Sequence, residues 1–160
     1  MDYYPLPQPD EVPVREREDA MGAYLMMFAA VGAGLPLPII SLIASIIYYF
    51  INRTKSKFVH FHALQSLLSQ LPVSLMNAMA VFWAIRILFF DWVFDEVYKA
   101  YLWMLLVVNL AYIIFSLVAA AKARKGQFYY FLFFGRICYQ SVFAVKEVAA
   151  PAPSNRPPGM

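Results

Sequence analysis

The chain has 160 residues, of which 62% are hydrophobic and 18% aromatic, while only 14% carry charge. A soluble domain is about 45–50% apolar, and a mean hydropathy of +0.58 leaves too few polar residues to cover a small globular surface. The composition therefore excludes an ordinary soluble domain and predicts an all-α integral membrane protein, whose main partner is the lipid bilayer. The net charge is +3, and no feature of the sequence indicates nucleic-acid binding.

Both ends of the chain differ from the rest in composition. Residues 1–19 are acidic and rich in proline, and residues 147–160 are again rich in proline. Such stretches cannot bury enough apolar surface to form a core. We therefore expect two disordered tails that flank a helical membrane domain over residues 20–146. The first tail lacks the basic and apolar regions of a secretory signal, so we expect the mature protein to begin at Met1.

The first apolar block covers residues 20–51 and is uncharged. As one helix it would be about 48 Å long, well beyond a bilayer core of roughly 30 Å. The sequence GLPLP lies near its middle, from Gly34 to Pro38, and its glycine and prolines predict a turn. We expect a short hairpin of two helices broken at Gly34 to Pro38. A single kinked span is the alternative, and the two arrangements place the N-terminus on opposite sides of the membrane.

Two further apolar blocks follow. Residues 58–90 are again too long for one span, and polar side chains recur at helical spacing in the first part. We expect a kink at Pro72 that separates an interfacial helix over 58–71 from a span over 73–90. The uncharged residues 100–121 have the length of one span. This gives about four transmembrane helices. Residues 127–145 contain Arg136 at their centre and predict an additional interfacial amphipathic segment.

The distribution of charge predicts the orientation in the membrane. Lysine and arginine residues cluster at 53–57 and at 122–125, whereas the loop that begins at Asp91 is acidic. By the positive-inside rule, the two basic clusters lie in the cytoplasm. With the hairpin, the N- and C-termini are both cytoplasmic, and we expect the protein in a bacterial cytoplasmic (inner) membrane.

Two motifs resemble those of a known family. The segment KFVHFHALQSLL at residues 57–68 and the segment AAAKARKGQFYY at 119–130 are similar to the signature and the ending of small bacterial four-helix membrane proteins of unknown function. A more distant resemblance is to the import component of about twenty kilodaltons in the chloroplast inner-envelope Tic translocon. The resemblance covers roughly residues 20–137. It departs from the pattern at 131–134, where FLFF stands in place of an early proline. It implies a helical subunit of a larger assembly that moves or inserts polypeptide.

The candidate site residues are polar side chains inside apolar helices. His62, Gln65, Ser66 and Ser69 form a stripe that could line a path or bind a partner, although a stripe at the membrane surface more simply faces water and headgroups. If the stripe docks a partner, replacing His62 and Gln65 by leucine should weaken assembly and leave stability intact. Asn77, Asn109 and the polar face made by Ser41, Ser45, Tyr48 and Asn52 are predicted to hold helices together, and lining a conducting path is the alternative role.

Three charged residues are candidates for interfacial positions. Arg86 is expected to reach the outer interface and to meet Asp91 or Asp95, while Arg136 is expected among the headgroups. No metal site or cofactor is predicted, because His60 and His62 diverge on a helix and Cys138 is the single cysteine.

These features favour a non-enzymatic subunit or accessory factor of a larger membrane protein complex. Its expected partners are other integral membrane proteins, and a homo-oligomer is also compatible with the sequence. A small solute or ion carrier or channel is the alternative, since a broken helix can build a binding site at mid-membrane. We do not expect an enzyme, because the apolar blocks contain neither paired carboxylates nor a nucleophile or metalloprotease motif.

Overall fold

The computed structural model describes residues 4–29, 38–131 and 133–144. Its elements are the short 3-10 helix η1 (Pro9–Glu11), α1 (Val14–Leu25), the 3-10 helix η2 (Met26–Phe28), α3 (Pro38–Asn52), α4 (Lys57–Phe89), α5 (Glu96–Arg124) and α6 (Phe134–Phe143). The described part of the chain is therefore helical and contains no β-strand, which confirms the predicted all-α class.

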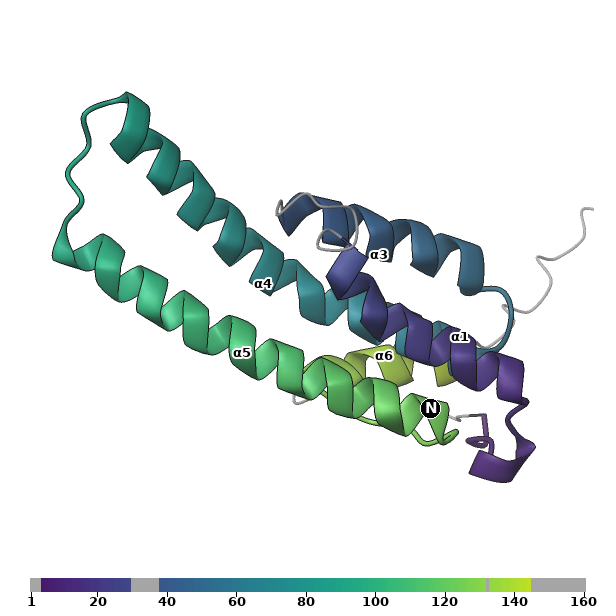
Figure 1. The fold of residues 1–160 in the computed structure, drawn as a ribbon. Helices are drawn as coiled ribbons and strands as arrows, with labels where there is room; N and C mark the ends of the chain where they lie inside the picture. Colours follow the sequence, from purple (N-terminus) through teal and green to yellow (C-terminus); the bar gives the residue numbers. More distant parts are fainter. Residues whose placement is uncertain (1–3, 30–37, 132, 145–160) are drawn as a thin grey trace, which may run out of the picture.

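The helices α4 and α5 form a long antiparallel pair (Figure 1). They contain 33 and 29 residues, so they are about 50 Å and about 44 Å long. Each begins at a side-chain cap, because Ser56 accepts a hydrogen bond from the Val59 amide at 3.2 Å and Asp95 accepts one from the Tyr98 amide at 2.9 Å. By length and composition, both helices can cross a membrane.

The helix α4 continues without a break through Pro72. The predicted division at this residue, into an interfacial helix and a separate span, is therefore wrong. A proline inside a helix removes one backbone hydrogen bond and crowds the carbonyl four residues earlier, which costs about 3 kcal/mol, so neighbouring contacts have to offset it. The helix is held on either side of it, since Gln70 contacts Ser45 of α3 and Asn77 contacts Asn109 of α5. The whole of residues 57–89 is one rod.

The first helix begins at Val14, so the expected boundary of a disordered tail at residue 19 is wrong. Arg17 explains the order of this segment, because its guanidinium donates to the carbonyls of Val12 and Pro9, each at 2.7 Å. Val12 is itself buried in a cluster with α1 and the end of α5. Gly126, with φ of +73°, permits this approach, since a Cβ there would lie 2.7 Å from the Pro9 carbonyl oxygen. Residues 145–160, with the predicted C-terminal tail, lie outside the described residues.

The helices α1 and α3 run antiparallel as two separate helices, which agrees with the hairpin and not with a single kinked span. Near one end, the Ser41 hydroxyl donates to the Met27 carbonyl at 2.8 Å. Near the other, the Tyr48 hydroxyl donates to the Asp19 carbonyl at 2.7 Å, and Lys55 forms an ion pair with the Asp19 carboxylate at 2.7 Å. The predicted turn itself falls mostly on residues 30–37, which lie outside the described residues.

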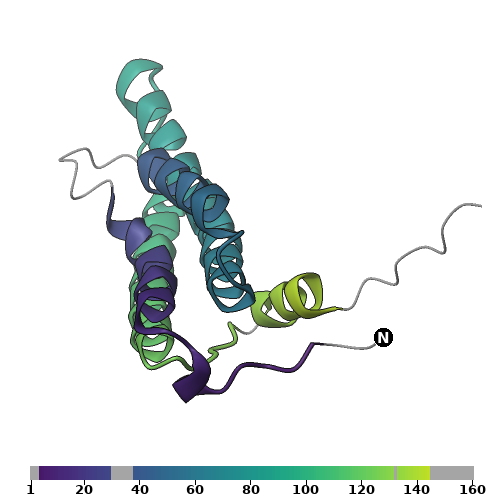
Figure 2. The same cartoon turned by 90° about the vertical axis from the view of Figure 1, so that its right-hand side faces the viewer.

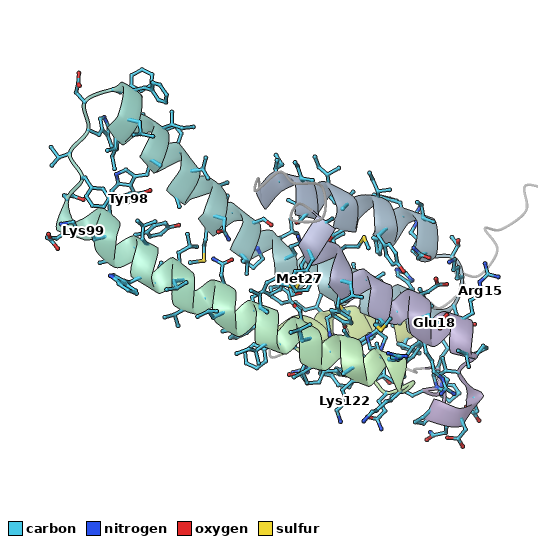
Figure 3. All side chains as sticks on the ribbon, in the orientation of Figure 1. Arg15, Glu18, Met27, Tyr98, Lys99 and Lys122 are labelled. Carbon is cyan, nitrogen blue, oxygen red and sulfur yellow. The ribbon has the colours of Figure 1, made fainter. Side chains whose placement is uncertain are left out.

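The bundle is thick at one end and thin at the other. The helices α1, α3 and α6 lie beside the same halves of α4 and α5, while the remaining halves project as a pair (Figures 1 and 2). Figure 3 labels Tyr98 and Lys99 at the tip of this pair, and Lys122, Arg15 and Glu18 at the opposite end. We call these two ends the tip and the bundle end.

The projecting halves of α4 and α5 expose their apolar side chains. Leu88 and Trp103 are 75% and 70% exposed. Only 11% and 22% of the most apolar windows of the two helices are buried, unlike the core helix of a soluble protein. Of the predicted four transmembrane helices, only these two have the required length among the described residues, because α1 and α3 contain 12 and 15 residues.

The last described helix, α6, is amphipathic and docks on α4. Its buried side consists of Gly135, Cys138, Val142 and Phe143, and the last three pack against Phe61 of α4. The predicted amphipathic segment at 127–145 is thus shorter as a helix than expected, because residues 127–131 are not helical.

Candidate functional site

The predicted polar stripe on α4 lies inside the bundle. His62, Gln65, Ser66 and Ser69 are all buried, with His62 and Gln65 completely so. The expectation that this stripe faces water and headgroups is therefore wrong. The reason is tertiary: α1 covers one side of the stripe, and the chain after α5 returns across it, which the pattern of α4 alone cannot show.

Three distant segments meet at a buried hydrogen-bonded cluster, which we call the polar joint. It comprises the side chains of Tyr24, His62 and Gln65 and the backbones of Tyr129 and Phe131. The Gln65 amide nitrogen donates to the Tyr24 hydroxyl at 2.9 Å and to the Tyr129 carbonyl at 2.7 Å. The Phe131 amide donates to the Gln65 side-chain oxygen at 3.4 Å, and the Tyr24 hydroxyl lies 2.9 Å from His62 Nδ1.

The chemistry of the polar joint determines the direction of its hydrogen bonds. A carbonyl can only accept, so the atom of Gln65 that faces Tyr129 must be its NH₂ group, whose second hydrogen points to the Tyr24 oxygen. The Tyr24 hydroxyl is then the donor to Nδ1 of His62. The His62 proton therefore resides on Nε2, an atom that is buried and has no hydrogen-bond partner among the described residues.

Aromatic rings enclose His62. The centroids of Phe58, Phe61 and Phe128 lie 4.5, 5.2 and 5.7 Å from the centroid of the imidazole. Because these rings keep water away, the polar joint consists of neutral groups. Its hydrogen bonds connect α1, α4 and the chain after α5. This geometry suits a structural connection better than a path.

The serines of the stripe also bond within the fold. The Ser66 hydroxyl donates to the Ala23 carbonyl at 2.7 Å, and the Ser69 hydroxyl donates to the Ser66 carbonyl at 2.9 Å. On α3, Ser45 donates to the side chain of Gln70. The polar face on α3 lies inside the bundle, as its predicted packing role requires, since its serines and asparagine are buried: Ser41, Ser45 and Asn52.

Asn77 and Asn109 hold α4 and α5 together near their middles. The Asn77 amide donates to the Asn109 side-chain oxygen at 3.0 Å, and the reverse bond measures 3.3 Å. Each amide uses its second hydrogen on a carbonyl of its own helix. These contacts are the ones that the packing role predicted for these two residues requires. Toward the tip, the hydroxyls of Tyr101 and Tyr98 continue the connection by donating to the carbonyls of Met76 and Ala80.

We predict that Asn77→Leu lowers the free energy of unfolding by about 0.6–1.7 kcal/mol, the range measured for interhelical hydrogen bonds in membranes. Because the two amides bond only to each other across the interface, Asn77→Leu and Asn109→Leu should be non-additive. Unfolding by denaturing detergent in mixed micelles measures both effects. Strict additivity in this double-mutant cycle would show that the pair does not interact energetically.

Arg86 makes aromatic contacts near the tip. Its guanidinium carbon lies 5.0 Å from the ring centroid of Phe90 and 4.7 Å from that of Trp92. The ion pairs of the described residues join Lys55 to Asp19 and Lys99 to Glu96, so the expected contact of Arg86 with an aspartate is wrong.

The backbone explains why Arg86 meets rings. Asp91 adopts a left-handed conformation, with φ of 55°, and the Trp92 amide turns back to the Arg86 carbonyl at 3.4 Å. This turn brings the indole over the guanidinium and leaves Asp91 exposed. Arg136 is exposed on the outer side of α6, consistent with an interfacial position.

The sequence reasoning missed the tyrosines. Tyr24, Tyr98 and Tyr101 supply hydroxyls to contacts between helices, yet each stands in an apolar stretch, where a tyrosine is normally interpreted as a lipid-facing or interfacial residue. The backbone of Tyr129 was missed for a different reason, since no side-chain pattern reports which carbonyl a distant glutamine will meet. A buried tyrosine needs a partner for its hydroxyl, and that requirement is the one signal that was available.

The described residues contain no group of three or more histidine, cysteine, aspartate or glutamate side chains that could hold a metal ion. Cys138 is buried, and burial raises the pKa of its thiol to about 12. A pocket between α5 and the start of α6 is lined by aromatic side chains: Phe115, Tyr129, Tyr130, Phe131, Phe133 and Phe134.

Comparison with known proteins identifies the family. No curated protein and no solved structure matches the chain. A family model does match, over residues 16–138, and describes the magnetosome magnetite crystal formation proteins, MamF/MmsF. The assignment by resemblance to four-helix proteins of unknown function and to the Tic translocon is therefore wrong, and the link to protein transport falls with it. Because the match covers most of the chain, the protein belongs to the MamF/MmsF magnetosome magnetite crystal formation family.

Proposed function

We propose that this protein is a non-enzymatic integral protein of the magnetosome membrane that supports the formation of magnetite crystals. The family match over residues 16–138 carries the proposal. The exposed apolar halves of α4 and α5 support the membrane location, since lipid is the solvent that such surfaces require. The closed and neutral polar joint favours an accessory role over that of a carrier.

The charges support a definite orientation. Lysine and arginine residues gather at the bundle end, where Lys55, Lys122 and Arg124 lie, whereas Lys99 and the ring-bound Arg86 are the bases near the tip among the described residues. By the positive-inside rule, the bundle end faces the cytoplasm. The magnetosome membrane is an invagination of the inner membrane. The tip accordingly faces the interior of the invagination, on the side of the enclosed crystal.

Crystal formation in cells tests the function. We expect that deleting the gene in the magnetite-forming bacterium that carries it alters the size or number of magnetite crystals seen by electron microscopy. The wild-type chain should restore them. Gln140→Leu, at an exposed position of α6, is the matched control for Gln65→Leu in the polar joint, and only the control should restore normal crystals. Unchanged crystals after deletion would contradict the proposed function.

Cysteine labelling tests the orientation. In intact isolated magnetosomes, a membrane-impermeant maleimide should label Lys125→Cys and should label Asp91→Cys only after detergent is added, because the two exposed positions flank opposite ends of α5. The buried Cys138 should give little background. Immediate labelling of Asp91→Cys together with protection of Lys125→Cys would reverse the proposed orientation.

A further inference from the structure

The thick part of the molecule covers only half the length of the membrane-crossing pair. Along α4, the buried residues run from Phe58 to Ser74, and beyond them only Ala80 is buried. Ser74 lies about 26 Å from the start of α4, close to the middle of this helix of 33 residues. The helices α1, α3 and α6 therefore accompany α4 and α5 on one side of the middle, and the other side consists of the pair alone (Figures 1 and 2).

The hairpin of α1 and α3 is too short to cross a bilayer and has an apolar outer face. Its 15-residue helix α3 is about 22 Å long, against a hydrocarbon core of roughly 30 Å. The outward side chains of α3 are large and exposed: Ile39, Ile43, Ile47, Phe50 and Ile51. The ion pair of Lys55 with Asp19 places the open end of the hairpin at the bundle end. The described helices of the hairpin therefore stop short of the opposite surface and lie mainly in one leaflet.

The two leaflets consequently have to make room for different cross-sections. A helix about 10 Å across occupies on the order of 80 Å² of membrane area. The leaflet at the bundle end holds α3 and the uncharged second half of α1 in addition to α4 and α5, so it accommodates about 80–160 Å² more than the opposite leaflet, before α6 is counted. An inclusion that is wider in one leaflet fits best where that leaflet is convex.

We propose that this chain is a membrane wedge that favours strongly curved bilayers with the bundle end on the convex side. The role of the wedge in the cell rests on the proposed function and its orientation, in which the bundle end faces the cytoplasm. The cytoplasmic leaflet is the convex one in a small invagination that projects into the cytoplasm. The wedge thus fits the curvature of the organelle membrane, and its partner is the lipid bilayer of a small vesicle.

Reconstitution of the full-length protein tests the wedge without any mineral. Vesicles of phosphatidylethanolamine and phosphatidylglycerol are prepared at diameters of about 50 nm and about 400 nm, and orientation is read by maleimide labelling of Lys125→Cys and Asp91→Cys from outside. We expect the ratio of bundle-out to bundle-in molecules to be about twofold or more higher in the small vesicles. An equal ratio at both diameters would overturn the wedge.

A matched pair of variants tests whether the hairpin causes the preference. Ile43→Lys with Ile47→Lys places charges on the lipid-facing side of α3 and should remove the size dependence. Gln140→Lys with Ser141→Lys adds the same charge on the exposed side of α6 and should retain it. Protection of Cys138 from maleimide shows that each variant is folded. A size dependence that survives in the folded α3 variant would refute the role of the hairpin.

The two proposals fail independently. Loss of the vesicle-size effect with altered crystals in the deletion strain would remove the wedge and keep the proposed function. A clear vesicle-size effect together with normal crystals in the deletion strain would keep the wedge and contradict the proposed function.

Discussion

Replacing Gln65 by leucine is expected to lower the free energy of unfolding by about 3 kcal/mol, because it leaves the Tyr129 carbonyl and the Phe131 amide without their partner inside the bundle. Each buried polar group that loses its partner costs about 1–3 kcal/mol. Unfolding by denaturing detergent measures the change. The double replacement of His62 and Gln65, which should be harmless to stability if the stripe docks a partner, is expected to destabilise the protein at least as strongly.

Two further variants separate hydrogen bonding from packing at this position. Gln65→Glu keeps the volume of the side chain but offers at most one donor hydrogen, when protonated, for the two acceptors Tyr129 and Tyr24, so it should also lower stability but by less than leucine. Gln140→Leu makes the same chemical change at an exposed position and should shift stability by less than about 0.5 kcal/mol. Equal stability of Gln65→Leu and Gln140→Leu would show that the polar joint does not contribute to the stability of the fold.

Gly135→Ala is expected to release α6 from α4. A Cβ at this position would lie 2.7 Å from Cβ and 2.8 Å from Cα of Tyr130, and the backbone atom cannot move away by a change of rotamer. Overpacking of this kind costs about 1–3 kcal/mol. Cys138, one turn further along α6, provides the measurement, because its buried thiol becomes accessible only when the helix leaves its site.

Maleimide labelling of Cys138 at neutral pH should be slow in the wild type and about tenfold faster or more in Gly135→Ala, since an opening free energy reduced by 1.4 kcal/mol changes the open population tenfold. Arg136→Ala is the control, because Arg136 neighbours the glycine and is exposed. If both variants label at the wild-type rate, the close contact between Gly135 and Tyr130 does not hold α6 in place.

Much of the fold could be predicted from residue patterns. The apolar blocks predict that helices occupy the regions of α4 and α5, although the block at residues 58–90 was wrongly divided at Pro72, and the GLPLP sequence predicts that the chain reverses between α1 and α3. The order of the acidic N-terminal segment could not be predicted. It depends on Arg17 meeting two backbone carbonyls and on Val12 reaching α5, contacts that are invisible to a reading based on net charge. The persistence of α4 through Pro72 likewise depends on neighbours and not on local propensity.

The residues of the candidate site could be named from the sequence, but their environment was predicted wrongly. His62 and Gln65 stand out in an apolar helix, and they do make the most connected contacts of the polar joint. Their periodicity on α4 shows that they share a face, but it carries no information about what covers that face. Asn77 and Asn109 were easier to interpret, because a lone asparagine at mid-membrane depth has few alternatives to a partner on the next helix.

The polar joint also bears on how the chain is made. Its hydrogen bonds link residues that are 38, 41 and 64 positions apart, and the last of them needs the carbonyl of Tyr129. A ribosome synthesises this residue only after α4 and α5 are complete. The glutamine and histidine of α4 therefore have to wait, without their final partners, while both long helices enter the bilayer. Closure of the bundle is a late step of biogenesis, and a chain that stops short of Tyr129 would insert its helices without completing its core.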